Sequence, residues 1–160
     1  MTDHNRGSRL VMGFDPGRDK CGIARVQWPC RSPVSGGTGP AFRPDIAIDQ
    51  MEVVESASAI AAVVAQCQIH PITTIVIGDG TSSKHWRQQL AAALPETVTL
   101  VAVNEYNSTQ EARDRYWRIH PARGLSGLLP PKLRSIPGPI DDIVAVILVE
   151  RWITTQSREF

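Results

Sequence analysis

The feature that most constrains the fold is an alternation of short apolar runs with longer amphipathic stretches along the 160 residues of the chain. The apolar runs predict five strands, at residues 9–15, 21–28, 46–54, 74–78 and 98–103. The last two runs are continuously apolar, as strands buried in a parallel sheet are. The amphipathic stretches predict four helices, at residues 56–70, from 82 or 83 to 94, 108–119 and 140–155.

The order of these elements predicts the fold class. Three early strands can pair through hairpins, and the two later strands each follow a helix, as in the crossover units of parallel sheets. We therefore expect an α/β protein in which a five-stranded mixed β-sheet is flanked by α-helices on both faces. Ser56 is the expected N-cap of the first helix. The length suits one domain, residues 1–160, which can bury a core without disulfides or metals.

The composition limits the classes of partner and compartment. Lys and Arg number 17 against 16 Asp and Glu, so any nucleic-acid partner must meet a local basic patch. The three cysteines, Cys21, Cys30 and Cys67, form no CxxC pair and indicate reduced thiols in a cytoplasmic protein. The amino end carries no apolar signal-like segment, and no apolar run approaches the roughly 18 residues of a membrane-spanning helix. We expect no membrane partner.

Acidic residues follow three of the predicted strands, at Asp15, Asp79 and Glu105, and Asp141 opens the last predicted helix. Ligands of open α/β sheets bind beyond the carboxyl ends of the parallel strands. Asp15, Glu105 and Asp141 therefore converge if the first strand lies in the middle of the sheet. Such an all-oxygen cluster suits Mg²⁺ or Mn²⁺ rather than zinc. Two other interpretations remain open, because Asp-Pro-Gly at Asp15 is a good turn in its own right and Asp141 is typical of a helix cap.

Two Pro-rich segments, residues 29–44 and 121–139, hold nine of the twelve prolines and are predicted to be loops. Residues 113–134, from the helix into the second segment, carry six basic residues against one acid, Asp114; the basic residues are Arg113, Arg115, Arg118, Arg123, Lys132 and Arg134. Such a region either holds a polyanion or is a solvated, charged surface. The aromatic residues Trp86, Tyr116 and Trp117 either stack on bases or pack in the core, and Trp152 is expected in the core.

Four segments, in this order, together resemble the YqgF family: residues 14–24 (FDPGRDKCGIA), 75–78 (IVIG), 104–113 (NEYNSTQEAR) and 140–148 (IDDIVAVIL). Members of this family are RuvC-like proteins of the ribonuclease H fold, regarded as Holliday junction resolvases or as nucleases that process precursor ribosomal RNA. The resemblance implies one RNase H-like domain. It also implies that Asp15, Glu105 and Asp141 are the catalytic residues and the ligands of Mg²⁺ or Mn²⁺.

The sequence departs from the family next to these acids. Asn104 and Tyr106 stand where the family usually has an Asp and an Arg, so the charge pairing of that Arg is not expected here. Asp79 is either an extra metal ligand, since RuvC-type resolvases keep an acid near the end of that strand, or a turn residue. Asp142 points about 100° away from Asp141 on a helix and is secondary.

The motifs and the resemblance together predict a metal-dependent endonuclease, a phosphodiesterase that acts on structured nucleic acid and above all on precursor ribosomal RNA. The residues expected to contact phosphates are Lys20, Arg123, Lys132 and Arg134. RNA is preferred over a DNA junction because a net charge of +1 offers little for a large duplex surface and because the resemblance favours ribosomal RNA processing. The chain is expected to be a monomer or a homodimer.

Three other functions stay open. The chain is alternatively a Holliday junction resolvase, or a catalytically weak nucleic-acid-binding or regulatory protein with the same fold. The third is a nucleotide-phosphate site like that of sugar kinases and actin-like ATPases, which share an acid and a glycine after the first strand. That class needs two such domains around the nucleotide, whereas this length supplies one.

Overall fold

The computed structural model describes residues 7–30 and 41–158. Its strands are β1 (Arg9–Asp15), β2 (Lys20–Trp28), β3 (Ala47–Glu55), β4 (Ile72–Gly78) and β5 (Thr99–Val103). Its α-helices are α1 (Ser56–Ile69), α2 (Ser83–Ala93), α3 (Ser108–Ile119) and α4 (Asp141–Gln156). All nine elements predicted from the sequence are confirmed, with ends that shift by one or two residues. Most of the first Pro-rich segment, residues 31–40, lies outside the described residues.

The five strands form one mixed sheet in the order β3-β2-β1-β4-β5. β1 pairs antiparallel with β2, and β2 with β3, through the predicted hairpins. β4 runs parallel to β1, and β5 parallel to β4. β1 is therefore the central strand. Because β1, β4 and β5 point the same way, their carboxyl ends meet at one edge of the sheet.

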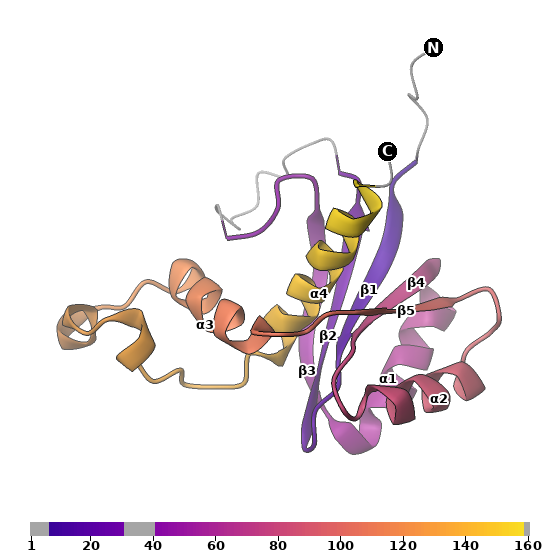
Figure 1. The fold of residues 1–160 in the computed structure, drawn as a ribbon, viewed down its shortest axis with the longest axis horizontal. Coiled ribbons are helices and arrows are strands. Elements are labelled where there is room, and N and C mark those ends of the chain that lie inside the picture. The colour runs from indigo at the N-terminus through magenta and orange to yellow at the C-terminus, as the bar shows by residue number, and fades with distance from the viewer. Residues whose placement is uncertain (1–6, 31–40, 159–160) are drawn as a thin grey trace, which may run out of the picture.

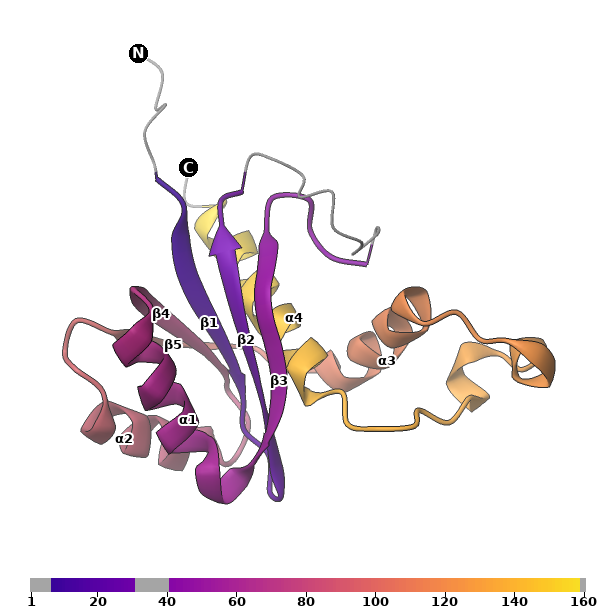
Figure 2. The same ribbon diagram turned by 180° about the vertical axis from the view of Figure 1, so that it is seen from behind.

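Helices cover both faces of the sheet (Figures 1 and 2). α1 and α2 pack on one face, against alternate residues of β1 such as Met12 and Phe14. α4 and α3 lie on the other face, where α4 contributes most of the core. Every residue from Ile143 to Glu150 is buried, and so is the predicted core residue Trp152. No helix of the described residues is long and apolar enough to cross a bilayer.

Two glycines let α4 lie directly on the sheet. A Cβ built at Gly13 of β1 would stand 2.0 Å from the carbonyl oxygen of Ala145. A Cβ at Gly22 of β2 would stand 1.9 Å from the carbonyl oxygen of Asp141 and 2.6 Å from the nitrogen of Asp142. Real Cβ atoms never approach backbone this closely, so these two positions require glycine. The first turn of α4 is thereby held against the central strands.

The prediction that Ser56 caps α1 is wrong. Strand β3 continues to Glu55, which is itself the N-cap residue, and Ser56 is the first helical residue. Its hydroxyl donates instead to the carbonyl oxygen of Gly17, 2.9 Å away in the β1–β2 hairpin. The side chain therefore ties the start of α1 to the turn that follows Asp15.

The second Pro-rich segment, residues 121–139, forms an arm that extends with α3 to one side of the sheet, at the left in Figure 1. It contains two short 3-10 helices, η1 (Gly124–Leu128) and η2 (Pro131–Leu133), and none of their residues is buried. Arg134 holds the arm together, donating from Nε to the Leu129 carbonyl at 2.8 Å and from Nη2 to the Gly127 carbonyl at 3.3 Å. Hydrogen bonds from the Arg134 side chain to backbone carbonyls, rather than apolar burial, hold this segment.

Candidate active site

The three acids singled out in the sequence line one cavity of about 580 Å³, called here the acid pocket. Asp15 comes from the end of central strand β1, Glu105 from the loop after β5, and Asp141 from the first turn of α4. The first half of α3 also lines the pocket, through residues that include Gln110 and Arg113. Segments far apart in the sequence therefore place three carboxylates around one space, as the strand order predicts.

Asp141 is positioned by the close contact between α4 and the hairpin. Gly22 admits the backbone of Asp141, and the Asp141 Oδ1 atom lies 3.8 Å from where a Cβ of Gly17 would be. The N-cap residue of α4 is Ile140, whose side chain makes no capping hydrogen bond, and the first-turn N–H of Ile143 donates to Asp142 rather than to Asp141. The helix-cap interpretation of Asp141 is therefore not supported, and its carboxylate lines the acid pocket.

Glu105 lies over the end of β4. A Cβ at Gly78 would stand 2.0 Å from its Oε2 atom, and one at Gly80 would stand 1.9 Å from Oε1. The backbone N–H of Glu105 donates to Asp79 Oδ1 at 3.1 Å, and the N–H of Asp79 donates to the Val103 carbonyl at 2.9 Å. Asp79 thus joins the ends of β4 and β5, and it is not among the residues that line the acid pocket.

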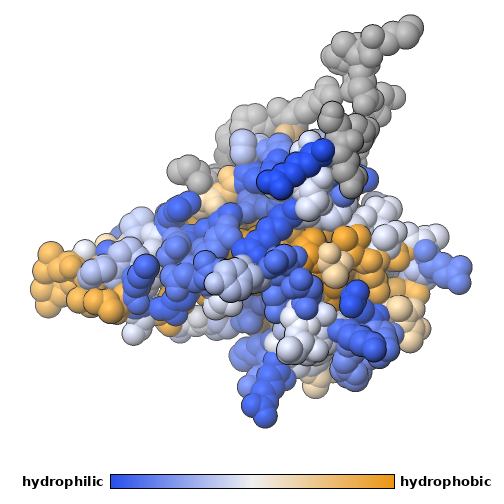
Figure 3. Space-filling model, in the orientation of Figure 1, coloured by the Kyte–Doolittle hydropathy of each residue, from blue (hydrophilic) through white to orange (hydrophobic). Residues whose placement is uncertain are grey.

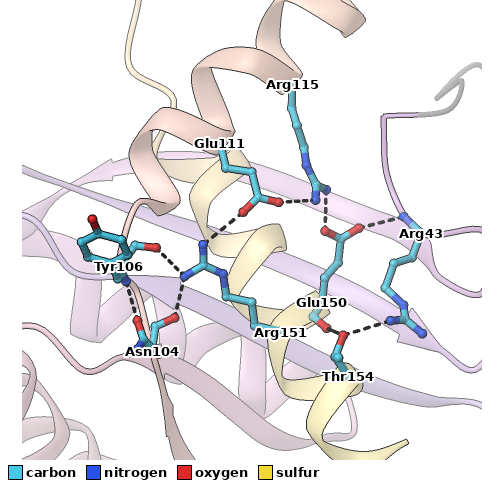
Figure 4. A network of polar contacts seen from close by, with 8 residues as sticks. All are labelled: Arg43, Asn104, Tyr106, Glu111, Arg115, Glu150, Arg151 and Thr154. Carbon is cyan, nitrogen blue, oxygen red and sulfur yellow. Dashed lines mark hydrogen bonds and ion pairs between the residues drawn. The ribbon is translucent and has the colours of Figure 1, made fainter.

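Arg151 of α4 forms hydrogen bonds with the loop on both sides of Glu105 (Figure 4). Its Nη1 donates to the carbonyl oxygens of Asn104 at 2.7 Å and Tyr106 at 3.0 Å. The Asn104 side chain accepts from the Tyr106 N–H at 2.7 Å, which closes the turn. An arginine from α4 therefore fixes the segment at which this chain departs from the resembling family.

A chain of ion pairs extends from Arg151 across α3 and α4 (Figure 4). Glu111 accepts from Arg151 at 3.0 Å and from Arg115 at 2.7 Å, and Arg115 also pairs with Glu150. Burial acts to raise the pKa of Glu111, but the hydrogen bonds from Arg151 and Arg115 lower it below its usual value. Glu150 in turn accepts from the backbone N–H of Arg43 at 2.7 Å. Arg115, counted above among the basic residues, therefore belongs to an internal network.

The electrostatics of the acid pocket are those of an uncompensated cluster. Burial raises the pKa of Asp15 to about 7, and the charges of Asp141 and Glu105 add to the rise. Burial also raises the pKa of Asp142, whose Oδ1 accepts from the Ile143 N–H at 2.8 Å. In the described part of the chain, no three His, Cys, Asp or Glu side chains are placed as they stand to hold a metal ion. The carboxylates face one space without closing on a common point.

Two solved structures are similar to this chain over most of its length. The structure of RuvC from Thermus thermophilus matches with a TM-score of 0.54 and 13% identity, covering 91% of this chain and 96% of RuvC. T. thermophilus RuvC in complex with a Holliday junction substrate matches with a TM-score of 0.53 and 14% identity, covering 93% and 96%. The chain has a ribonuclease H-like fold. No protein-family model and no curated protein matches its sequence.

Within this RNase H-like domain, the predicted phosphate-binding residues do not gather at the acid pocket. Lys20 pairs with Glu55 at 3.5 Å across β2 and β3. Arg134 is engaged by the carbonyls of the arm, and Lys132 is exposed on η2. Arg123 also lies on the arm, just before η1. Their role toward nucleic acid stays a prediction.

Arg113 belongs to the basic region noted in the sequence, but it was not among the residues expected to contact phosphates. It lies on α3, lines the acid pocket, and donates from Nη2 to the Arg134 carbonyl at 3.1 Å. The pocket's other polar side chains among the described residues carry no positive charge. A signal was present in the sequence, because Arg113 lies on the helix that begins at Ser108, three residues after Glu105.

Proposed function

We infer that this chain is a metal-dependent phosphodiesterase that cleaves nucleic acid at the acid pocket. The observation that carries the proposal is the convergence of Asp15, Glu105 and Asp141 in one cavity at the carboxyl edge of an RNase H-like sheet. The raised pKa of Asp15 supports it, because burying a carboxylate beside two others is unfavourable unless a cation neutralises them.

The donor set fits Mg²⁺ or Mn²⁺. The pocket offers carboxylate oxygens together with hydroxyl and amide oxygens, and the residues that line it include no His or Cys. Hard divalent cations prefer such oxygen ligands. Asp15, Glu105 and Asp141 would hold the metal, closing on it by rotation of their side chains. A bound divalent cation supplies a nucleophilic water at neutral pH and offsets the charge that develops on the scissile phosphate.

The protein's own side chains bind and orient the substrate. Arg113 lines the same pocket as the carboxylates, where its guanidinium neutralises a phosphate that enters. Asp79 and Arg151 act as positioning residues, because they hold the backbone on either side of Glu105. The buried first turn of α4 keeps the Asp141 carboxylate at a fixed place on the hairpin.

For the substrate, we propose structured RNA, with precursor ribosomal RNA as the first candidate, in keeping with the resemblance of the sequence to the YqgF family. A Holliday junction is the second candidate, favoured by the similarity to a RuvC that was solved with such a substrate. A protein that binds nucleic acid without efficient cleavage is the third. The cytoplasm is the proposed compartment.

The decisive experiment measures Mn²⁺ binding and cleavage in amide variants of the three acids. Asp15→Asn, Glu105→Gln and Asp141→Asn should each weaken Mn²⁺ binding and abolish cleavage while the fold persists, since each change removes a ligand charge and little volume. Asp142→Asn is the matched control and should keep both activities. Substrates should include precursor ribosomal RNA, single-stranded RNA and a four-way DNA junction at equal salt. Cleavage by Glu105→Gln at the wild-type rate would refute the assignment.

A further inference from the structure

A second cavity, of about 610 Å³, lies between the C-terminal half of α3 and the arm. We call it the aromatic groove. Trp117 and His120 of α3 form one wall, and Leu129 and Leu133 of the arm form another. Arg123 lines the same cavity. The groove thus combines flat rings, aliphatic side chains and positive charge, and the acid pocket shares none of its lining residues.

The rings of the groove are held in place by one another. The Tyr116 ring meets the Trp117 ring edge-on at 5.0 Å between centroids and lies 4.6 Å from the His120 ring. The Arg134 guanidinium carbon lies 5.5 Å from the Trp117 ring. The Trp117 Nε1–H is buried and has no hydrogen-bond partner among the described residues. Rings that are already held in place suit a flat ligand.

The charge of this region selects an anion. From Arg115 to Ile140 the sequence contains five basic residues and no acid. Arg115 is engaged inside the protein by Glu111 and Glu150, but Arg118, Arg123 and Lys132 are not part of that network. The occupant must therefore offer negative charge together with flat apolar faces. Unpaired nucleotides have both, whereas a regular duplex keeps its base faces stacked inside.

The groove continues the acid pocket along α3. Arg113 lines the pocket, and Trp117, one helical turn further on, lines the groove, about 6 Å along the helix axis. The hydrogen bond from Arg113 to the Arg134 carbonyl joins the helix to the arm between the two cavities. A strand that leaves the pocket along α3 therefore reaches the groove directly.

The outer surface of the arm is apolar as well. Leu125, Leu128 and Leu133 are 85%, 81% and 68% exposed. Figure 3 shows this apolar tip at the left end of the molecule. Of these three, Leu133 also lines the groove, where an aliphatic side chain excludes water from bases that enter it.

We propose that the aromatic groove binds unpaired nucleotides of a single-stranded RNA segment that runs along α3 beside the acid pocket. RNA is the occupant assigned, because its loops and ends present splayed bases to aromatic side chains. The assignment extends the proposed function by naming the form of its substrate. Binding at the groove does not depend on metal or cleavage.

The test is binding of a fluorescent single-stranded RNA to the full chain in EDTA, compared with the same sequence in a duplex and with single-stranded DNA. Wild-type protein should bind the single-stranded RNA tightest. Trp117→Ala should weaken that binding about 5- to 150-fold, the range for loss of one stacked base, and leave duplex binding unchanged. Trp117→Phe keeps a stacking ring and should restore most of the affinity.

Charge is tested by a matched pair of variants. Arg123→Ala removes a cation that lines the groove, whereas Arg118→Ala removes an exposed cation of α3 that lines neither cavity. Arg123→Ala should lower the dependence of log affinity on log salt by about 0.7, and Arg118→Ala should leave it nearly unchanged. Near-UV circular dichroism checks that each variant keeps its packing.

Three results would overturn the proposal: wild-type affinity in Trp117→Ala, equal effects of the two arginine variants, or DNA binding as tight as RNA binding. Sedimentation equilibrium adds a fourth, since a dimer that Trp117→Ala dissociates would show that a second copy occupies the groove. Loss of groove binding with intact Mn²⁺ binding at the acid pocket would leave the nuclease proposal standing. RNA binding at the groove in a protein that cleaves no substrate would leave the groove proposal standing and refute the nuclease proposal.

Discussion

The acid pocket and the arm are built in opposite ways. The pocket is held by α4, whose residues from Ile143 to Glu150 are all buried and whose backbone touches the sheet at Gly13 and Gly22. The arm buries none of the residues of η1 and η2 and is held by hydrogen bonds to backbone carbonyls. Burial fixes the carboxylates, whereas the arm keeps its apolar and basic side chains exposed.

The difference separates two requirements of one proposed reaction. Metal ligands need geometry that does not relax, which close packing supplies. A surface that meets a variable nucleic acid gains from low local stability, because it can adjust on binding. We therefore expect changes in the pocket to alter global stability or metal binding, and changes in the arm to alter local order and nucleic-acid binding.

The largest change in stability is expected at Asp15, whose ionised form is unfavourable in the acid pocket. Asp15 ionises with a pKa of about 7 in the folded protein, against 3.8 as the unperturbed value. Its contribution to stability is fully present below about pH 4 and is lost as the pH rises to 7. At about 1.36 kcal/mol per pKa unit, the shift changes the free energy of unfolding by about 4 kcal/mol. Asp15→Asn should therefore be more stable than wild type by up to that amount at pH 8 in EDTA, and no more stable from this cause at pH 4.

Urea unfolding at both pH values measures this difference. Added Mn²⁺ should stabilise the wild type at pH 8 and leave Asp15→Asn unchanged, because the variant lacks a ligand charge. Equal stability of the two proteins at pH 8 would contradict the uncompensated cluster.

The next effect comes from the contact between α4 and β2. Gly22→Ala places a Cβ against backbone atoms of Asp141 and Asp142, so the helix must move away from the sheet. We expect a loss of about 1–3 kcal/mol in the free energy of unfolding, together with weaker Mn²⁺ binding. Gly138→Ala is the control in the arm, where a new Cβ has no atom within 4 Å. Equal unfolding midpoints for the two variants would remove the contrast between pocket and arm.

A smaller effect is expected at Arg151. Arg151→Met removes the donors to the Asn104 and Tyr106 carbonyls and to Glu111, which should cost about 1–2 kcal/mol at this half-buried position. The loop that carries Glu105 should loosen, so Mn²⁺ affinity should fall as well. Arg158→Met makes the same change at an exposed position near the end of α4. It should leave both quantities unaltered, and a similar loss there would show that Arg151 acts only by its charge.

Gly80→Ala should separate the geometry of the pocket from its stability. The new Cβ meets the carboxylate of Glu105, the free end of a side chain, which can turn aside at little cost. The free energy of unfolding should change by less than about 0.5 kcal/mol, while Mn²⁺ affinity falls at least about tenfold. Calorimetric titration and urea unfolding of one preparation give both values. A large loss of stability with normal metal binding would be the opposite of this expectation.

The smallest global effect is expected in the arm. Arg134→Met removes the hydrogen bonds to the carbonyls of Leu129 and Gly127. Thermolysin should then cut the arm faster, while the free energy of unfolding of the domain changes by no more than about 0.3 kcal/mol. Lys132→Met, with the same change of charge at an exposed position, should not speed the cleavage. Cooperative unfolding of the whole domain in Arg134→Met would show that arm and body are one unit.

The sequence determined the elements of this fold and the identity of the acids. Apolar periodicity is a local signal, so the bounds of all five strands and four helices could be predicted to within one or two residues. The position of acids at strand ends predicted their convergence, because parallel strands share one edge. The Ser56 cap was wrong since its hydroxyl takes a partner in a distant hairpin.

The tertiary structure alone decided which charges face which. Arg113, Arg115 and Arg134 look alike in the sequence, yet they line the acid pocket, enter an ion-pair network and brace the arm, respectively. The role of each arginine depends on which atoms of α4 and of the arm lie next to its side chain. The same holds for Gly13 and Gly22, whose need for glycine comes from backbone atoms of Ala145 and Asp141 far away in the chain. Local patterns specify secondary structure, whereas contacts between distant segments specify the environment of each charge.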